Sequence, residues 1–174
     1  IWIGKIDQDI AGTAAGNWFL TGTNGYGGNL MTAYENATTQ VMGSVLGKNT
    51  YAWNHLAIAR HEVDTSKWIL STGWYKDSKG DPAQFLINLT AGQVAPDKLT
   101  ASSGVVIYTL SQYSYIYPPG TPARVDGSSE PYPVGYTLGS GTSLGSLVIQ
   151  VNNDNSLSIE FGSAFTSDKR TYNR

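Results

Sequence analysis

Apolar and polar residues alternate with a period of two through most of the chain, which predicts β-strands. The clearest central example is a hairpin with strands at residues 55–63 (HLAIARHEV) and 68–75 (WILSTGWY) around a polar turn at residues 64–67. The period of two places four residues of the second strand on one face: Trp68, Leu70, Thr72 and Trp74. Because that face carries two indoles, we expect it to lie inside the protein.

A second hairpin is predicted near the end of the chain, with strands at residues 147–151 and 156–161 around the turn Asn152-Asn153-Asp154-Asn155. We expect its apolar face to point inward: Leu147, Ile149, Val151, Leu157, Ile159 and Phe161. The alternating residues Gln150, Ser158 and Glu160 are expected to face water, as in an antiparallel pair with one wet face.

Three further strands are expected at residues 18–23, 84–89 and 104–117, and in the last of these Tyr108 and Leu110 share a face. Residues 29–46 predict a short helix or an irregular loop, because Asn, Thr and Gly interrupt a weak 3-4 spacing. Residues 118–145 are rich in Pro, Gly and Ser and are expected to form one long loop.

These elements predict an all-β protein with a single β domain over residues 1–174. Turn signals recur every 8–15 residues without a βαβ rhythm, which favours a single antiparallel β-barrel, with a β-sandwich or jelly roll as the alternative. The composition agrees, since 20 Gly, 11 Tyr and 5 Trp occur among 174 residues while charged residues make up only 14%.

Charge and cysteine content narrow the classes of function. The net charge is −2 and the sequence contains no run of basic residues, so nucleic acid is a poor partner. The chain has no Cys and no apolar run long enough for a transmembrane segment. Few charges, a first residue other than Met and the missing disulfides favour a secreted or extracytoplasmic (cell-envelope) protein of prokaryotic origin. Two sequons, at Asn36 and Asn88, leave glycosylation open.

Motifs that suggest catalysis or metal binding are better explained as turns and strands. Residues 141–145 spell G-x-S-x-G, but both histidines lie far upstream, whereas a nucleophile elbow needs one downstream. A glycoside hydrolase needs two carboxylates across a cleft, and none of the chain's glutamates lies in such a setting: Glu35, Glu62, Glu130 and Glu160. We therefore assign no catalytic residue, no metal site and no cofactor, and the glycoside hydrolase stays the less favoured alternative.

Gly16 and Trp18, within the segment IDQDIAGTAAGNWF, form a Gly-x-Trp that resembles the first barrel strand of lipocalins. The resemblance to lipocalin-like (calycin) β-barrel proteins implies that Trp18 plugs one end of the barrel. It also implies that an arginine after the last strand, Arg170 or Arg174, packs over Trp18. Avidin-like barrels of the same group are similar in composition, and the pairing of GNWF with the ending FTSDKRTYNR is similar to secreted bacterial β proteins of no assigned function. Residues 1–15 fit either a segment that closes one barrel end or a frayed terminus.

The pattern and the resemblance together predict a non-catalytic protein that binds a small apolar or aromatic ligand inside the barrel. Trp68, Trp74 and Tyr108 are the expected pocket wall, unless these rings merely fill a closed core. An alternative is a carbohydrate- or surface-binding module in which exposed tyrosines stack on a glycan: Tyr113, Tyr115, Tyr117 and Tyr132. A structural envelope or appendage subunit, as a possible homo-oligomer, is a further alternative.

Overall fold

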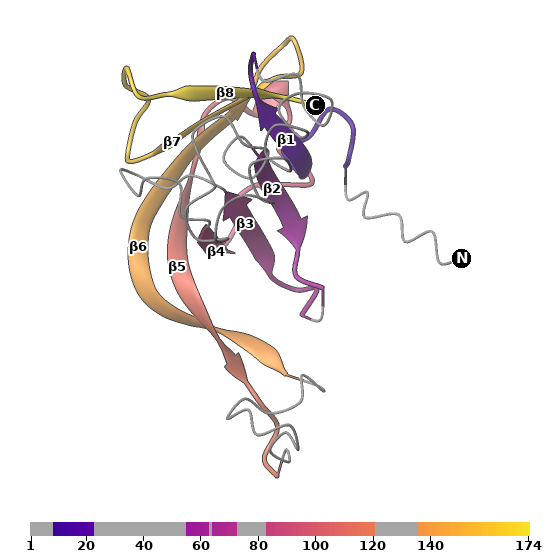
Figure 1. Ribbon diagram of the computed structural model, residues 1–174, viewed down its shortest axis with the longest axis vertical. Helices are drawn as coiled ribbons and strands as arrows, with labels where there is room; N and C mark the ends of the chain where they lie inside the picture. The colour runs from indigo at the N-terminus through magenta and orange to yellow at the C-terminus, as the bar shows by residue number, and fades with distance from the viewer. Residues whose placement is uncertain (1–8, 23–54, 63, 73–82, 121–135) are drawn as a thin grey trace, which may run out of the picture.

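The computed structural model describes residues 9–22, 55–62, 64–72, 83–120 and 136–174. The predicted all-β fold is confirmed, because eight strands close into an antiparallel barrel (Figure 1). Each strand pairs with the next one along the chain, and the last pairs with the first. A closed ring of strands in this order excludes the sandwich and jelly-roll alternatives.

Two strands are much longer than the other six. The strands are β1 (Gly16–Leu20), β2 (His55–Arg60), β3 (Trp68–Thr72), β4 (Ala83–Asn88), β5 (Val106–Ile116), β6 (Thr137–Val151), β7 (Leu157–Phe161) and β8 (Arg170–Asn173), and the short 3-10 turn η2 (Ala101–Ser103) precedes β5. β5 has 11 residues and β6 has 15, whereas the others have four to six. In Figure 1 the paired ends of β5 and β6 extend well past the other strands.

The barrel interior is built from the side chains that alternate inward along each strand. On β3, Trp68, Leu70 and Thr72 are 2%, 0% and 3% exposed, as the period of two predicts. The terminal hairpin pairs Leu147 with Phe161 and Ile149 with Ile159, so its predicted apolar face also points inward. Buried residues from all eight strands and from two loops form one continuous core: Ala14, Ala15, Trp18, Leu56, Ile58, Trp68, Leu70, Phe85, Ile87, Leu99, Tyr108, Leu110, Leu147, Ile149, Val151, Leu157, Ile159 and Tyr172.

Two of the three residues predicted to face water on the terminal hairpin are buried, since Ser158 is 3% and Glu160 is 9% exposed, whereas Gln150 is half-buried. The loop between β7 and β8 folds back over this face. The Glu160 carboxylate accepts hydrogen bonds from the Thr166 N–H and hydroxyl, both at 2.6 Å, and the Asn152 side chain donates to the Ser158 hydroxyl at 2.9 Å. These polar groups can be buried at little cost because each has a hydrogen-bond partner.

The long loop predicted at residues 118–145 is wrong in its last part, because β6 already begins at Thr137. This half of β6 is rich in Gly and Ser and has no run of apolar residues. It pairs with the tyrosine-rich end of β5, across register shifts at Leu110/Ser111 and Ser111/Tyr113. Pairing with a neighbouring strand outweighs weak intrinsic β propensity here. β2 also ends earlier than predicted, at Arg60, and the helix expected at 29–46 lies outside the described residues.

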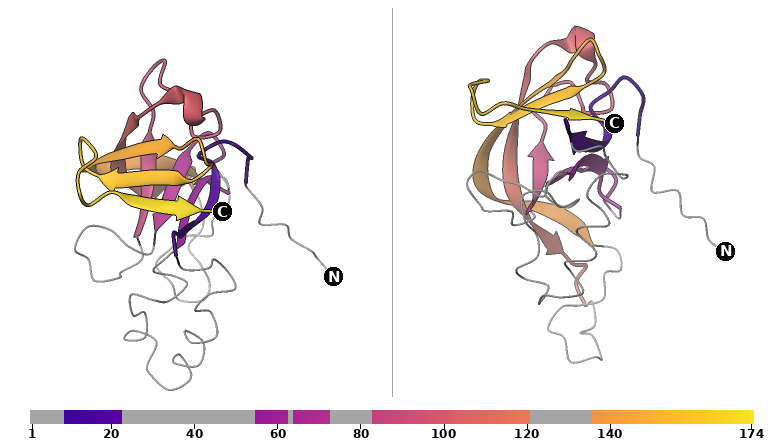
Figure 2. Two further views of the ribbon diagram at one scale, coloured as in Figure 1. Left: turned by 90° about the horizontal axis from the view of Figure 1, so that it is seen from above. Right: turned by 45° about the horizontal axis from the view of Figure 1, so that its top comes forward.

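Two loops cover one end of the barrel, where β2 ends and β3 begins. The Ala14 and Ala15 N–H groups donate to the Leu99 and Pro96 carbonyls at 2.9 and 3.2 Å, which ties residues 9–15 to the loop between β4 and β5. Residues 9–15 therefore close the barrel and are not frayed, whereas residues 1–8 lie outside the described part. Figure 2 shows the C-terminus beside β1 at this end.

Candidate functional site

Trp18 and Arg174 form a stack that seals the covered end of the barrel. The Arg174 guanidinium lies 4.2 Å from the centre of the Trp18 ring, and Trp18 is 1% exposed. The Trp18 indole N–H donates to the Ala14 carbonyl at 2.9 Å. Of the two arginines proposed for this position, Arg174 is the one that occupies it. The ring of Trp18 is therefore covered by Arg174 and its N–H is hydrogen-bonded, which fits a structural role.

Arg174 also explains why a glycine stands at position 16. Its guanidinium donates to the carbonyl groups of Ile10, Thr13 and Ala15. One side chain therefore holds residues 9–15, which we call the leading loop. Gly16 has φ of +139°, and a Cβ there would collide with the Asp9 carboxylate and with Arg174. Only glycine fits this backbone angle and this close approach.

A second arginine stacks on Trp68, but the indole N–H of Trp68 is not hydrogen-bonded within the described part of the chain. The Arg60 guanidinium lies 4.2 Å from the Trp68 ring centre and 3.5 Å from the Asp97 carboxylate. Arg60 follows Leu56 and Ile58 on the same face of β2, and its side chain is 40% exposed where it covers this end of the core. The Trp68 indole N–H is buried and has no hydrogen-bond partner in the part of the chain that the structure describes.

Tyr108 belongs to the same core as Trp68. It is fully buried, and its hydroxyl donates to the Val94 carbonyl at 2.8 Å. Burial, and then the nearby Asp97 carboxylate, raise the pKa of the Tyr108 phenol. Trp74, the third expected member of this pocket wall, lies outside the described residues. Trp68 and Tyr108 thus lie together among close-packed core side chains.

The three tyrosines predicted on the long strand come together on one face of β5. Tyr113 and Tyr115 alternate along β5, Tyr117 continues this alternation directly after the last residue of the strand, and Tyr136 joins them from the segment that leads into β6. The ring centres of Tyr115 and Tyr136 are 4.5 Å apart in an edge-to-face contact, and Tyr117 lies 5.9 Å from Tyr136. We call these four residues the tyrosine cluster. The His61 ring borders it at 5.8 Å from Tyr136.

The tyrosine cluster is held against the outer face of the barrel wall. Ile69 and Leu86 point away from the interior and form a second buried group with Tyr136 and Leu138. We call residues 111–116 of β5 with residues 137–143 of β6 the arm, and it crosses this outer face.

Four hydrogen bonds fix the arm in place. The Tyr113 hydroxyl donates to the Gln84 side chain at 2.7 Å, and the Leu138 N–H donates to the Asp64 carboxylate at 3.0 Å. The Asn88 carboxamide donates to the Ser111 hydroxyl and accepts from the Ser140 hydroxyl, both at 2.9 Å. Because its amide nitrogen is engaged in this way, a glycan on Asn88 conflicts with the arm's position.

Exposure separates the anchors of the arm from its outer rings. Tyr136 and Leu138 are 5% and 4% exposed and fix the arm, whereas Tyr115 is 43% exposed and Tyr113 and Tyr117 are half-buried. Burial, and then the neighbouring Tyr115, raise the pKa of Tyr113, so its phenol is neutral at physiological pH. Tyr113 therefore adds an uncharged phenol to this aromatic surface.

Asp64, in the turn between β2 and β3, is an acidic group in direct contact with one of the anchors. The Leu138 N–H and then the Ser66 hydroxyl hold the pKa of the Asp64 carboxyl below its usual range. A charged Asp64 thus accepts the backbone hydrogen bond that keeps the start of β6 beside this turn.

Sequence reasoning found the outer rings but missed the residues that hold them. Tyr136 falls in the segment that was predicted to be a loop, although Tyr136 and Leu138 already show the period of two. His61 and Gln84 gave no separate signal, because nothing in their local sequence indicates that a distant strand covers them. Tyr132 lies outside the described residues.

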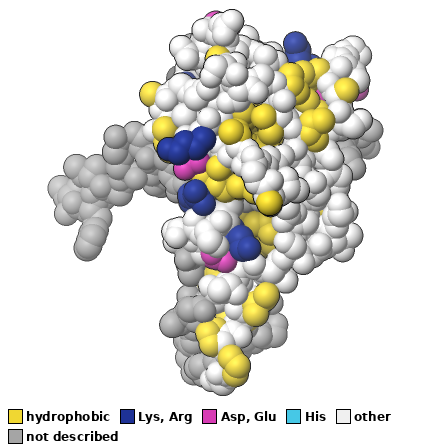
Figure 3. Space-filling view, turned by 180° about the vertical axis from the view of Figure 1, so that it is seen from behind, with side chains coloured by type: hydrophobic (Ala, Val, Ile, Leu, Met, Phe, Trp, Pro, Cys, Tyr) yellow, Lys and Arg dark blue, Asp and Glu magenta, His cyan; other side chains and the backbone are white. Residues whose placement is uncertain are grey.

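Other kinds of site find little support among the described residues. No group of three or more His, Asp or Glu side chains is placed there to share a metal ion. The same residues include no helix long and apolar enough to cross a membrane. Figure 3 shows a face of the molecule with few charged side chains and scattered hydrophobic ones, in keeping with the chain's low charge.

The comparisons add no relative. No family model, no curated protein and no solved structure matches the chain. The resemblance to lipocalin-like barrels therefore stays a prediction, which rests on Gly16 and Trp18 and gains the observed position of Arg174.

Proposed function

We propose that this chain is a non-catalytic carbohydrate-binding protein and that the tyrosine cluster is its contact surface. The observation that carries the proposal is the position of Tyr115. Its ring is 43% exposed, yet it is held at 4.5 Å against Tyr136, which is buried. An exposed ring on a fixed support binds with little loss of conformational entropy.

The chemistry of the cluster suits a neutral glycan. Tyrosine combines a flat apolar ring with a polar hydroxyl, and a sugar combines apolar C–H faces with hydroxyl groups. The Gln84 and Ser140 side chains lie at the border of the cluster and add hydrogen-bonding groups. Nucleic acid is disfavoured, because Glu62 and Asp64 lie nearby and the whole chain is slightly acidic. A secreted or cell-envelope location agrees with this function and forms part of the proposal.

Binding to an array of neutral oligosaccharides tests the proposal. We expect the unaltered protein to bind at least one glycan, and Tyr115→Ala or Tyr117→Ala to remove the binding. Ile116→Ala is the matched control, because Ile116 is 54% exposed on the opposite face of the same strand. If the tyrosine variants bind as well as Ile116→Ala does, the cluster is not the contact surface.

A small apolar ligand inside the barrel is a second candidate function, favoured by the indole N–H of Trp68, which has no partner among the residues that the structure describes. A buried donor without an acceptor costs about 1–3 kcal/mol, and a ligand with one acceptor atom removes this cost. Native mass spectrometry of the protein from its producing cells tests this candidate. A bound small molecule that is lost in Trp68→Phe supports it, whereas a mass equal to the bare chain under gentle conditions contradicts it.

A further inference from the structure

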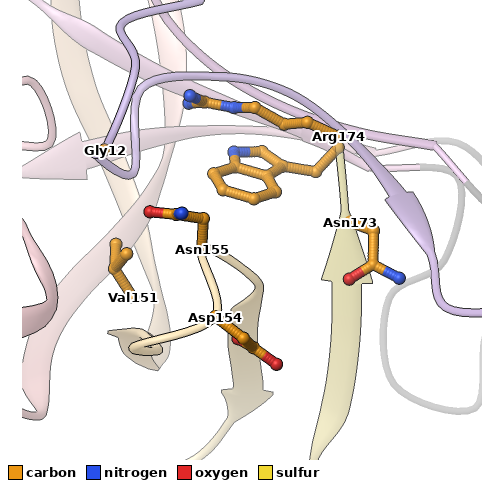
Figure 4. Close-up of a pocket in the computed structure, with 7 residues that line it drawn as sticks. Gly12, Val151, Asp154, Asn155, Asn173 and Arg174 are labelled. Carbon is orange, nitrogen blue, oxygen red and sulfur yellow. The ribbon is translucent and has the colours of Figure 1, made fainter.

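A separate pocket of about 320 Å³ lies at the covered end of the barrel (Figure 4). None of the residues that line it belongs to the tyrosine cluster. Its lining comes from the leading loop, from β1, from the β6–β7 turn and from the end of the chain: Gly12, Trp18, Val151, Asp154, Asn155, Asn173 and Arg174. In Figure 4 the Arg174 side chain spans one side of this pocket and the Asn155 side chain enters it from the turn. The volume lies near the lower limit for pockets that hold small molecules.

The turn holds Asn155 in a fixed position. Asn155 has φ of +62°, in the left-handed region that Gly and Asn tolerate best. Its N–H donates to the Asn152 carbonyl at 3.0 Å, and the Asn152 N–H donates to the Ser156 carbonyl at 2.8 Å. The Asp154 carboxylate accepts the Ser156 N–H at 3.0 Å and the Ser156 hydroxyl at 2.6 Å. The Asn155 side chain is therefore preorganised, although the turn does not require its carboxamide.

The polar groups around the pocket differ in whether they are already engaged. No side-chain hydrogen bond within the described ranges involves the carboxamide of Asn155 or that of Asn173. Arg174, in contrast, donates to three backbone carbonyls of the leading loop. The Ser156 hydroxyl, and then its N–H, lower the pKa of Asp154, so this carboxylate is charged near neutral pH. The residues that line the pocket thus include two asparagines whose carboxamides are open and one charged aspartate.

We propose that this pocket binds a neutral, polyhydroxylated small molecule of the size of a monosaccharide. Each carboxamide offers a donor and an acceptor side by side, which matches two adjacent hydroxyl groups. An anionic ligand is disfavoured, because Asp154 repels it and Arg174 is committed to the loop. A large apolar ligand is disfavoured as well, because Trp18 is 1% exposed and offers only a small part of its surface. The site does not depend on the tyrosine cluster, which lies on other elements.

Titration of the ¹⁵N-labelled protein with D-glucose, D-galactose and N-acetyl-D-glucosamine tests the pocket. The side-chain NH₂ signals of Asn155 and Asn173 report directly on the groups that the proposal uses. We expect at least one of these sugars to shift both signals. Asn155→Gly keeps the left-handed turn and removes the carboxamide, so it should weaken the binding at least about tenfold, equal to about 1.4 kcal/mol. Asn153→Ala is the matched control, since Asn153 is exposed in the same turn and does not line the pocket.

Two outcomes overturn the inference. One is the absence of any shift at Asn155 and Asn173 with all three sugars. The other is equal binding by Asn155→Gly and Asn153→Ala, when both retain the spectrum of the folded barrel. The Tyr115→Ala variant keeps this test apart from the carbohydrate function proposed above. Shifts at the pocket must persist in that variant, and shifts that occur only at tyrosine rings count against the pocket alone.

Discussion

The barrel interior and the tyrosine cluster are both aromatic, but they expose their rings very differently. Trp68 and Tyr108 are 2% and 0% exposed and lie in one continuous core. Tyr115 is 43% exposed and rests on a small buried group outside the barrel wall. The first region has the character of a packed core, and the second has the character of a contact surface.

A single strand supplies both regions, and this shows what decides between the two roles. β5 directs Tyr108 inward, and the period of two continues past the register shifts to place Tyr113, Tyr115 and Tyr117 on the outer face. Residue type is the same at these positions. The face of the pleat, and whether another element covers it, determines whether a tyrosine stabilises the fold or remains accessible to a ligand.

Tyr108→Ala should have the largest effect, on the interior side of this comparison. Removal of a fully buried ring that also donates to the Val94 carbonyl is expected to lower the free energy of unfolding by about 3–5 kcal/mol. Urea denaturation followed by tryptophan fluorescence measures the change. If the free energy of unfolding falls by less than about 1 kcal/mol, the interior around Tyr108 is loosely filled, and the interior and the tyrosine cluster differ less than we propose.

Leu138→Ala should have an intermediate effect, because Leu138 links the two regions. It is 4% exposed between the arm and the barrel wall, so its truncation is expected to cost about 2 kcal/mol. The same change should weaken glycan binding, since the arm loses part of its anchor while all the outer rings remain. Unfolding curves and array binding of the same preparation measure both effects. Full binding by this variant indicates that the cluster does not need its support.

Tyr115→Ala should change stability little, by no more than about 0.5–1 kcal/mol, because Tyr115 is 43% exposed and lies outside the barrel core. This variant and Tyr108→Ala remove the same side chain from the same strand, so their unfolding midpoints in urea compare the two faces directly. A large loss of stability in Tyr115→Ala places this ring with the core residues and contradicts the division.

The smallest expected effect concerns Asp64, which holds the start of β6 through the Leu138 N–H. Its pKa is lowered in the folded protein, so its contribution to stability is present above the ordinary Asp pKa of about 3.9 and is lost as the pH falls through the lower, folded value. Asp64 lies at the surface and is only partly buried, so the total contribution should be small.

An NMR titration toward acid tests this interaction. The Leu138 amide signal should move with a midpoint below the ordinary Asp pKa, and Asp64→Asn should abolish the movement. A Leu138 signal that titrates identically in Asp64→Asn shows that the hydrogen bond does not persist in solution.

Sequence reasoning predicted the parts of the fold that depend on local alternation. The period of two identified the inward faces of β3, β6 and β7, and it placed Tyr113, Tyr115 and Tyr117 on one side of β5. It failed where distant elements decide burial, as for Glu160, which the β7–β8 loop covers through Thr166. It also failed for the Gly- and Ser-rich start of β6, which becomes a strand only because β5 lies beside it.

The candidate site was predictable to a similar extent. Its outer tyrosines follow from alternation, but their support by Tyr136 and Leu138 arises from the folding of the arm onto β3 and β4. Arg174 was anticipated through the resemblance to lipocalin-like barrels, as a residue after the last strand that packs over Trp18. The pocket beside it was not anticipated, because it joins a turn, a leading loop and the last residues of the chain.

The most direct test of the central claim is to map a bound glycan on the aromatic signals of the protein. Cellohexaose, xylohexaose and chitohexaose serve as probes, and the ring signals of Tyr113, Tyr115 and Tyr117 are followed together with the indole N–H signal of Trp68. The proposed function predicts shifts at these tyrosines with at least one probe and none at Trp68. Shifts at the Trp68 indole with unchanged tyrosine rings contradict it and place the ligand inside the barrel.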